Sequence, residues 1–555
     1  MKKFLIIFSA ALFSLPIAAQ EGVSGQTSAP SFTWFSKEIP LKANKEFQFL
    51  AYYINQAVTS NMYPKNDLLK GQVVGRLFGS NTSRTSNQLT SAYLEQRLIP
   101  FIIYQPHLFN GKAILRMSFE IDWTWGDVSY GTGGNFGSAF SADQVNLQTQ
   151  NIEIELNPVP RLYINLGLQR LFDTPYNPYR TMVDKMLTTG YRLMYFGSDG
   201  VGVNARYDWD FARLRAGYYK LYENYIQKND DVSLFELIGE KDISRAWKAG
   251  GSVYYMPDRA SGQGGISVFG QGLNSSWARQ MGTYQFRYGA AKYKADIAWL
   301  GAFFGRNTEH WLDEWQLNGF VNVNIGRSDT ATVENPSTKD WKKATDIFGF
   351  AANLRGSYRY GQTLNDCVSL DLLYASGDAN GLKDGKFNGV ITGNYYGGPG
   401  AIPVGTGSYL VLPHSNVVNR YTPAVADISN MGYGMAFAAV NVSKSFIPNR
   451  LNGKIGGVFA ASPITPVGGG NIIGSEINGN LCYNFGPYMS VELHAAKMFL
   501  GNFYDSNQNT YSSAVNGWEA DHTTPEGVEV NEDGLPNARP TSPWTAFLVF
   551  KWLLF

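Results

Sequence analysis

Residues 113–125 constrain the fold of this chain more than any other segment. One alternate set of positions is Leu115, Met117, Phe119, Ile121, Trp123 and Trp125, and the other is Arg116, Ser118, Glu120, Asp122 and Thr124. A period of two places these sets on opposite faces of a β-strand. The apolar face ends in two tryptophans, which suit a membrane interface. The run also has the length of roughly 9–11 residues that a spanning strand needs. The pattern therefore predicts a strand of an outer-membrane β-barrel, with lipid outside and water inside.

Both ends of the chain agree with export to an outer membrane. Residues 1–19 have the basic start, apolar core and small-residue end of a secretory signal peptide. The last predicted strand, 543–555, closes on Phe555, which resembles the signal that the barrel assembly machinery reads, although Lys551 interrupts one phase. The alternative for this end is the buried last strand of a periplasmic enzyme. We predict a signal peptide (1–19), a periplasmic segment (20–45) and one barrel domain (46–555).

Composition favours the same class of protein. Aromatic residues make up 14% of the chain and charged residues only 16%, against about 25% charged in a usual soluble domain. The formal net charge of +1 gives no reason to expect a nucleic-acid partner. Cys367 and Cys482 fall on separate predicted strands. Two separate thiols are favoured over a disulfide, and we expect no cofactor and no metal.

Alternating segments recur along the whole chain and predict an antiparallel up-and-down barrel. Twenty candidate strands can be drawn, of which 263–271 and 281–289 have the weakest pattern. Because single-chain bacterial barrels use even strand numbers, we expect about 18, within 16–20. Short periplasmic turns are expected near 157–160, 208–210, 360–366, 447–450 and 486–488. Long outer connections are expected near 58–89, 126–143, 171–199, 325–345, 377–431 and 501–542, with a short outer connection at 289–291 as the exception.

Charged residues in these strands share the phase opposite to the apolar one. An Arg or Lys on the lipid face costs roughly 2–4 kcal/mol at the midplane, so these side chains should face the lumen. The expected pore-lining residues are Arg116, Glu120, Asp122, Glu153, Glu155, Arg170, Arg213, Arg215, Arg355, Arg359 and Asp371. Two interpretations remain. The arginines attract an anionic solute into a pore while the acids orient them, or the charges pair and hold a plugged barrel together.

Two short motifs resemble the alginate-export family of outer-membrane porins. Residues 162–170 end in Gln169-Arg170, an altered form of that family's Gly-Arg-Gln strand end. Residues 374–378, Tyr-Ala-Ser-Gly-Asp, match a strand end that opens a long outer loop in that family. The resemblance implies a monomeric barrel of about 18 strands whose Arg-rich lumen passes an anionic polysaccharide. A capsule-assembly barrel is the second choice.

The loop at 377–431 is rich in Gly, Asn and Pro. It either folds into the lumen as a constriction, to which Asp378, Asn380 and Asp384 would contribute, or lies over the mouth of the barrel. The stretch 378–384 faintly resembles a calcium loop, because oxygen ligands and Gly recur in it. An ordinary Gly-rich turn is the favoured interpretation, because the terminal bidentate Glu is missing.

Enzyme signatures are absent from the sequence. It contains five histidines but no Gly-x-Ser-x-Gly elbow and no His-Glu-x-x-His motif. We therefore predict a channel rather than an enzyme, in the outer membrane of a Gram-negative cell, passing a small polar or polysaccharide solute. Its other expected partners are outer-membrane lipid and lipopolysaccharide. The alternative is a barrel for surface-polysaccharide (capsule) assembly, or a loop-displaying barrel with a plugged lumen.

Overall fold

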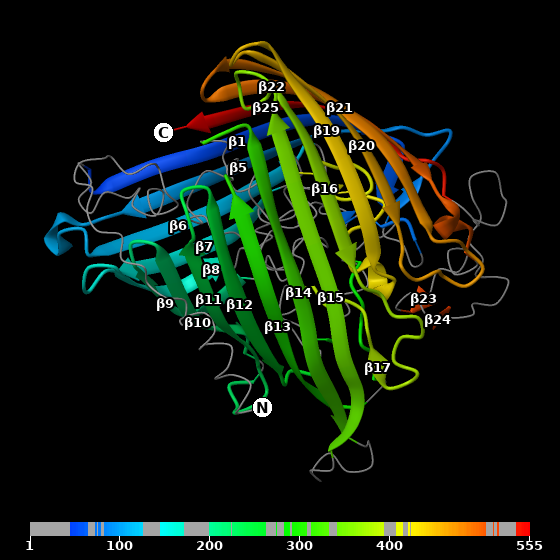
Figure 1. Ribbon diagram of the computed structural model, residues 1–555, viewed down its shortest axis with the longest axis horizontal. Coiled ribbons are helices and arrows are strands. Elements are labelled where there is room, and N and C mark those ends of the chain that lie inside the picture. Colours follow the sequence, from blue (N-terminus) through cyan, green and yellow to red (C-terminus); the bar gives the residue numbers. More distant parts are fainter. Residues whose placement is uncertain are drawn as a thin grey trace.

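The chain forms a closed antiparallel β-barrel of eighteen strands, as expected (Figure 1). The computed structural model describes residues 45–64, 73–74, 76–78, 83–125, 145–170, 199–223, 225–261, 273–274, 282–288, 291–307, 312–331, 341–392, 407–414, 420–421, 423–506, 514–515, 519–520 and 540–554. The predicted signal peptide and most of the predicted periplasmic segment lie outside these residues.

Consecutive barrel strands pair with each other around the ring. The first half is β1 (Phe47–Ser60), β5 (Ser91–Tyr104), β6 (Ala113–Thr124), β7 (Val145–Leu156), β8 (Leu162–Arg170), β9 (Asp199–Asp208), β10 (Ala212–Tyr222), β11 (Val232–Asp242) and β12 (Trp247–Asp258). The second half is β13 (Tyr293–Arg306), β14 (Trp315–Ala331), β15 (Trp341–Arg359), β16 (Cys367–Ala375), β19 (Met435–Ile447), β20 (Leu451–Ala461), β21 (Ile472–Gly486), β22 (Met489–Leu500) and β25 (Trp544–Leu554).

The first and last strands close the ring. Strand β1 pairs with β5 on one side and with β25 on the other, from Ala51 opposite Leu554 to Ser60 opposite Thr545. Closure leaves no unpaired strand edge, which is the condition for a β-sheet to cross lipid.

Short strand pieces belong to the connections between the barrel strands. Strand β2 (Met62–Pro64) pairs with β4 (Ser83–Thr85), β3 (Val73–Val74) with β18 (Arg420–Tyr421), and β23 (Ala514–Val515) with β24 (Glu519–Ala520). Strand β17 (Lys386–Phe387) runs parallel to β15. Three 3₁₀ turns are η2 (His107–Phe109), η4 (Asn430–Gly432) and η5 (Asn502–Asp505). Among the described residues, no helix is long and apolar enough to cross a membrane.

The two faces of the barrel differ as the alternation predicts. On β6, Arg116, Ser118 and Asp122 are buried, whereas the apolar residues between them are partly exposed. On β25, Lys551 shares the inward phase with Phe547 and Val549, while Leu548 and Trp552 are exposed on the other side. The sequence suggested that Lys551 interrupts the apolar phase of this strand. Its side chain instead belongs to the inner face.

One end of the barrel carries short turns and the other carries the long connections. The turns 157–161, 209–211, 448–450 and 487–488 lie at the end where β1 begins and β25 finishes. The opposite end carries the connections 61–90, 259–292, 376–434 and 501–543. This asymmetry is the one expected of an outer-membrane barrel.

Two predicted connections and one predicted strand were wrong. The loop expected at 325–345 shrinks to 332–340, because β14 and β15 stay paired from Trp315 opposite Tyr358 to Ala331 opposite Trp341. Figure 1 shows both strands running past their neighbours. Their outer ends are polar, since a paired ribbon that projects into water needs no apolar face.

The expected strand at 281–289 is an irregular segment over its described part, 282–288. Its alternating aromatics pack within the connection instead, with the rings of Tyr284 and Phe286 at 4.3 and 4.8 Å from that of Phe387. The short outer connection expected at 289–291 is therefore part of the long connection 259–292. The expected strand at 263–271 lies outside the described residues.

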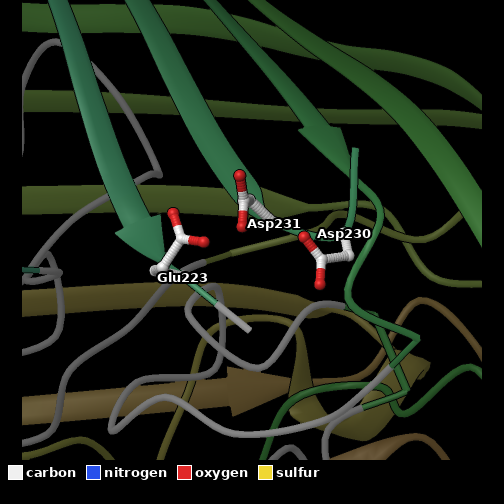
Figure 2. Close-up of side chains that lie close together, drawn as sticks. All are labelled: Glu223, Asp230 and Asp231. Carbon is white, nitrogen blue, oxygen red and sulfur yellow. The ribbon is translucent and has the colours of Figure 1, made fainter. Parts of the chain in front are cut away.

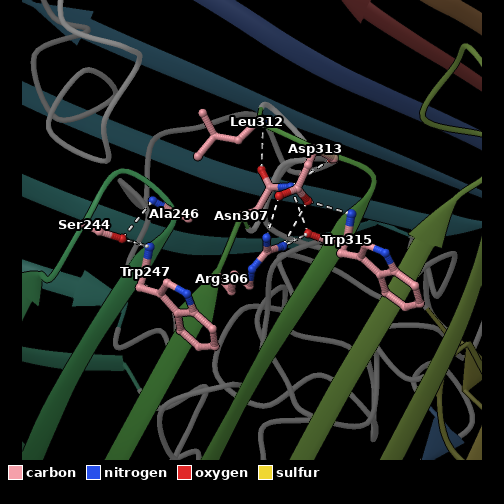
Figure 3. Close-up of polar contacts among 8 residues, drawn as sticks. All are labelled: Ser244, Ala246, Trp247, Arg306, Asn307, Leu312, Asp313 and Trp315. Carbon is pink, nitrogen blue, oxygen red and sulfur yellow. Dashed lines mark hydrogen bonds and ion pairs between the residues drawn. The ribbon is translucent and has the colours of Figure 1, made fainter.

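Side-chain hydrogen bonds fix the short turns (Figure 3). In the turn between β13 and β14, Arg306 donates to both carboxylate oxygens of Asp313, at 2.9 and 2.5 Å, and the Trp315 amide donates to the same carboxylate at 2.8 Å. The bonds from Arg306 and then from Trp315 lower the pKa of Asp313 to about 2. Cys367 and Cys482 are separate thiols, which confirms the favoured interpretation.

The first prediction tests which face of the barrel meets lipid. Val440, at the middle of β19, is 47% exposed, and its neighbour Asn441 lies on the inward phase. Val440→Arg should lower the free energy of unfolding in phospholipid bilayers by roughly 2–4 kcal/mol, since it places a charge near the midplane. Asn441→Arg is the matched control and should cost clearly less. Equal losses in urea titrations of the two variants would contradict this assignment of faces.

Candidate functional site

Ion pairs cover the inner wall across β5, β6 and β7. Arg97 donates to both carboxylate oxygens of Asp122, at 2.8 and 2.7 Å. Arg116 makes a similar two-point contact with Glu155, at 3.1 and 3.0 Å, and lies 3.8 Å from Glu153. All five side chains are buried. Neighbouring strands place these residues on one face because opposed positions share a face of the sheet.

The charged wall continues onto β9, β10 and β11. Arg206 and Arg213 both contact Asp208, at 3.2 and 2.8 Å. Arg215 donates to Glu236 at 3.0 Å. Most of the predicted arginines therefore face carboxylates rather than open space. A carboxylate accepts hydrogen bonds from only some of the five N–H donors of a guanidinium.

One inward cation, Arg359, differs from the rest. Arg355 is paired with Asp371 on the neighbouring strand. By contrast, Arg359 has no carboxylate within ion-pair distance among the described residues. The Lys454 ammonium lies 5.1 Å from the Tyr409 ring centroid, and the carboxylates of Glu476 and Glu492 are near enough to act on its charge. The side chains of Glu120 and Arg170 lie outside the described part of the chain, so their predicted direction stays a prediction.

Described parts of the connection between β16 and β19 contact the inner wall, and we call this connection, residues 376–434, the inward loop. Its base is built by Ser376, Gly377 and Asp378, the end of the Tyr-Ala-Ser-Gly-Asp motif. The Ser376 hydroxyl donates to the Asn388 carbonyl at 2.7 Å, and a Cβ on Gly377 would lie 2.2 Å from the Tyr433 carbonyl oxygen. The motif therefore begins the loop by packing its own backbone closely against Asn388 and Tyr433, which belong to later parts of the loop.

The three residues expected at a constriction lie at the outer base of this loop. Asp378 is buried and accepts hydrogen bonds from the amides of Asn380, Gly381 and Asn388 at 2.7–3.0 Å. Asn380 and Asp384 are exposed and bond to each other at 3.2 Å. They form a turn rather than the part that contacts the inner wall. That part is residues 387–392 and 408–414.

Glu476 of β21 is the anchor for the second of these segments. Its carboxylate accepts hydrogen bonds from the amides of Tyr409, Leu410 and Val411, at 2.7–2.9 Å, and from the Ser408 hydroxyl at 2.7 Å. Consecutive amides aimed at one point form a nest for an anion. Here the anion comes from the barrel wall, so the loop is bound to the wall as a ligand would be.

An aromatic stack holds the end of the same segment. The Phe547 ring lies parallel to the rings of both His414 and His494, with centroids 4.8 and 4.6 Å away. His494 also accepts or shares a hydrogen bond with the Tyr409 hydroxyl at 2.9 Å, and it contacts Glu492 at 2.9 Å. Burial and then the nearby His494 lower the pKa of His414 to about 3. Its imidazole is therefore neutral at ordinary pH.

Sequence reasoning missed several inner-wall residues that complete these contacts. Arg97 and Glu236 alternate with apolar neighbours and could have been found by the same period of two. Glu476 gives no comparable signal, because its role depends on where a loop far along the chain comes to lie. Residues 391 and 408–411 of the loop bind side chains of the inner wall, whereas Asn380 and Asp384 are exposed at its outer base.

Another group of charges lies at the outer ends of β10 and β11 (Figure 2). Glu223, Asp230 and Asp231 bring carboxylate oxygens within 4.8 Å of one another. Lys220 already pairs with Glu223, at 3.1 Å, and with Asp231. A cation is thus supplied by the chain itself.

Comparison with solved structures finds porins. The chain is similar to Pseudomonas aeruginosa OccK2 (OpdF) in complex with glucuronate, with 11% identity over 92% of this chain and 96% of that chain, and a TM-score of 0.42. It is also similar to OpdK from the same organism, with 11% identity, 91% and 98% coverage and a TM-score of 0.42. For a BenF-like porin from Pseudomonas fluorescens Pf-5 the values are 10%, 92%, 98% and 0.45. No protein-family model and no curated protein matches the chain.

The second prediction concerns the anchor of the inward loop. Glu476→Gln keeps the shape of the side chain but removes its charge. Each hydrogen bond to a charged group contributes roughly 1.5–3 kcal/mol, so hydrogen exchange at the amides of Tyr409, Leu410 and Val411 should become at least about tenfold faster. Glu236→Gln is the matched control, because Glu236 is also a buried inner-wall carboxylate but is bound to Arg215. Unchanged exchange in Glu476→Gln would show that the anchor does not hold the loop.

Proposed function

We propose that this protein is a channel of the bacterial outer membrane through which a polar solute, anionic or oligosaccharide in nature, crosses. The observation that carries this proposal is an inward cation without a carboxylate partner among the described residues, Arg359. A charge in a dry interior is strongly unfavourable unless it is paired. Such cations are stable where water or a passing anion surrounds them.

The paired charges support the same function in another way. Ion pairs such as Arg97 with Asp122 and Arg116 with Glu155 fix side chains along the inner wall. Fixed charges and hydrogen-bonding groups are what sets the selectivity of an aqueous pore. In this proposal Arg359, at the short-turn end of β15, contributes the attraction for anions.

The alternative is a plugged barrel that assembles or displays surface polysaccharide. The buried apolar segment Leu410–Leu412 of the inward loop favours it, because a loop that packs this well on the wall reduces the open cross-section. We favour the channel because a plugged lumen leaves Arg359 without a neutralising partner among the described residues. The resemblance to the alginate-export family points to the same kind of solute.

The third prediction tests the channel and its charge selectivity together. The refolded wild-type protein should give steady single-channel currents in planar bilayers, with a reversal potential that indicates anion preference under a salt gradient. Arg359→Gln should lower the anion-to-cation permeability ratio roughly twofold, since one fixed lumen charge is removed. The matched control is Lys444→Gln, which removes the same charge from the exposed face near the same end of the barrel.

The outcomes separate the two functions. Absence of current through folded, heat-modifiable wild-type protein would reject the channel and favour the plugged barrel. Current with equal ratios in the wild type and in Arg359→Gln would keep the channel but reject the role of Arg359.

A further inference from the structure

Asn322, on the inner face of β14, is buried without any hydrogen-bond partner. Its side chain is 0% exposed, and neither its amide nitrogen nor its amide oxygen is bonded within the described structure. The residues directly opposite it are Gly301 on β13 and Ala351 on β15. Because both are small, the amide lies in a niche of the wall. A buried amide without partners is unfavourable and calls for a ligand or water.

Two neighbouring amides have spare capacity as well. Asn324 lies two residues along the same face, and Asn353 lies diagonally across on β15, opposite Phe320. The Asn324 nitrogen and the Asn353 oxygen have no partner among the described residues. Together the three amides offer unused donors and acceptors but no charge.

A short segment of the inward loop, residues 389–392, covers this wall, and we call it the strap. The Ile391 amide donates to the Asn324 oxygen at 3.1 Å, and its carbonyl accepts a hydrogen bond from the Trp299 indole at 2.9 Å. A Cβ on Gly349 would lie 2.3 Å from the Gly389 carbonyl oxygen, so only glycine lets the strap approach so closely. The amide and carbonyl of Ile391 in the strap are therefore bonded to an acceptor and a donor of the wall, the Asn324 oxygen and the Trp299 indole.

We infer that Asn322, Asn324, Asn353 and Trp299 form a subsite for a neutral, hydroxyl-bearing solute such as a sugar, which takes the place of the strap peptide. This inference rests on the proposed channel function and names a substrate class for it. A sugar hydroxyl both donates and accepts, as the peptide of Ile391 does, and can also use the free groups of Asn322. The aromatic side chains of Trp299, Phe303 and Phe320 on the same face suit the apolar faces of a sugar ring. The nearby cation, Arg355, is already paired with Asp371.

The test compares Asn322→Leu with the wild-type protein, using maltotriose as the probe. Maltotriose should block the single-channel current of the wild type and bind to the folded protein in calorimetry. Asn322→Leu should weaken both effects at least about tenfold, the factor expected for one lost hydrogen-bonding group. Its unfolding midpoint should not fall, because the amide that it removes has no partner in the fold. Asn318→Leu, on the same strand and the same inner face, is the matched control and should bind maltotriose as the wild type does.

Further measurements keep the result decisive. Asn322→Ala replaces Asn322→Leu if leucine prevents folding. Maltotriose should also accelerate hydrogen exchange at the Ile391 amide, which a purely structural role for Asn322 would not do. Equal maltotriose affinity in Asn322→Leu and the wild type would overturn the subsite, as would conduction by a wild-type protein that binds no maltotriose. A wild-type protein that binds maltotriose through Asn322 but carries no current would keep the subsite and reject the channel.

Discussion

Closure of the sheet between β1 and β25 is the constraint on which the rest of this structure depends. A closed barrel pairs every strand edge, and it gives each strand one outer and one inner face. The alternation of side chains then decides where each charge lies. Leu548 and Trp552 are exposed on the outside of β25, while Lys551, between them in sequence, reaches Glu492 inside. The ion pairs of the inner wall follow from this separation rather than from any local motif.

The inner wall also acts as the binding partner of the inward loop. Glu476 gathers three consecutive amides of the loop, and Phe547 lies between the rings of His414 and His494. The loop in turn covers the amides on β14, where Asn322 keeps unused hydrogen-bonding groups. Selectivity in this account comes from two sources, the fixed charges of the wall and the contacts that the loop shares with a solute.

The fold could be predicted from the sequence because its signal is repeated in every strand. In residues 113–125 the apolar side chains lie on one face of the strand, and Arg116 and Asp122 lie on the other, buried face. The prediction failed where a segment alternates without pairing as a strand, or pairs as a strand without alternating. Residues 282–288 alternate but pack inside a connection, whereas the ends of β14 and β15 pair without an apolar face.

The candidate site could be predicted only in part. Period two brings Arg116, Glu155 and Arg215 to the inner face, but it does not say which carboxylate each one meets. Glu476 and Asn322 acquire their importance from a loop that is distant in sequence, and no local pattern marks such contacts. The Tyr-Ala-Ser-Gly-Asp motif did mark where the inward loop begins, since Ser376 and Asp378 bind the loop's own backbone there.

In the proposed channel, water and polar solutes pass between the charged wall and the inward loop. The most direct measurement is the swelling rate of liposomes that contain the refolded protein, after dilution into an isotonic solution of a small sugar. We expect rapid swelling that slows as the sugar becomes larger. Swelling no faster than that of protein-free liposomes, with the barrel shown to be folded, would contradict it.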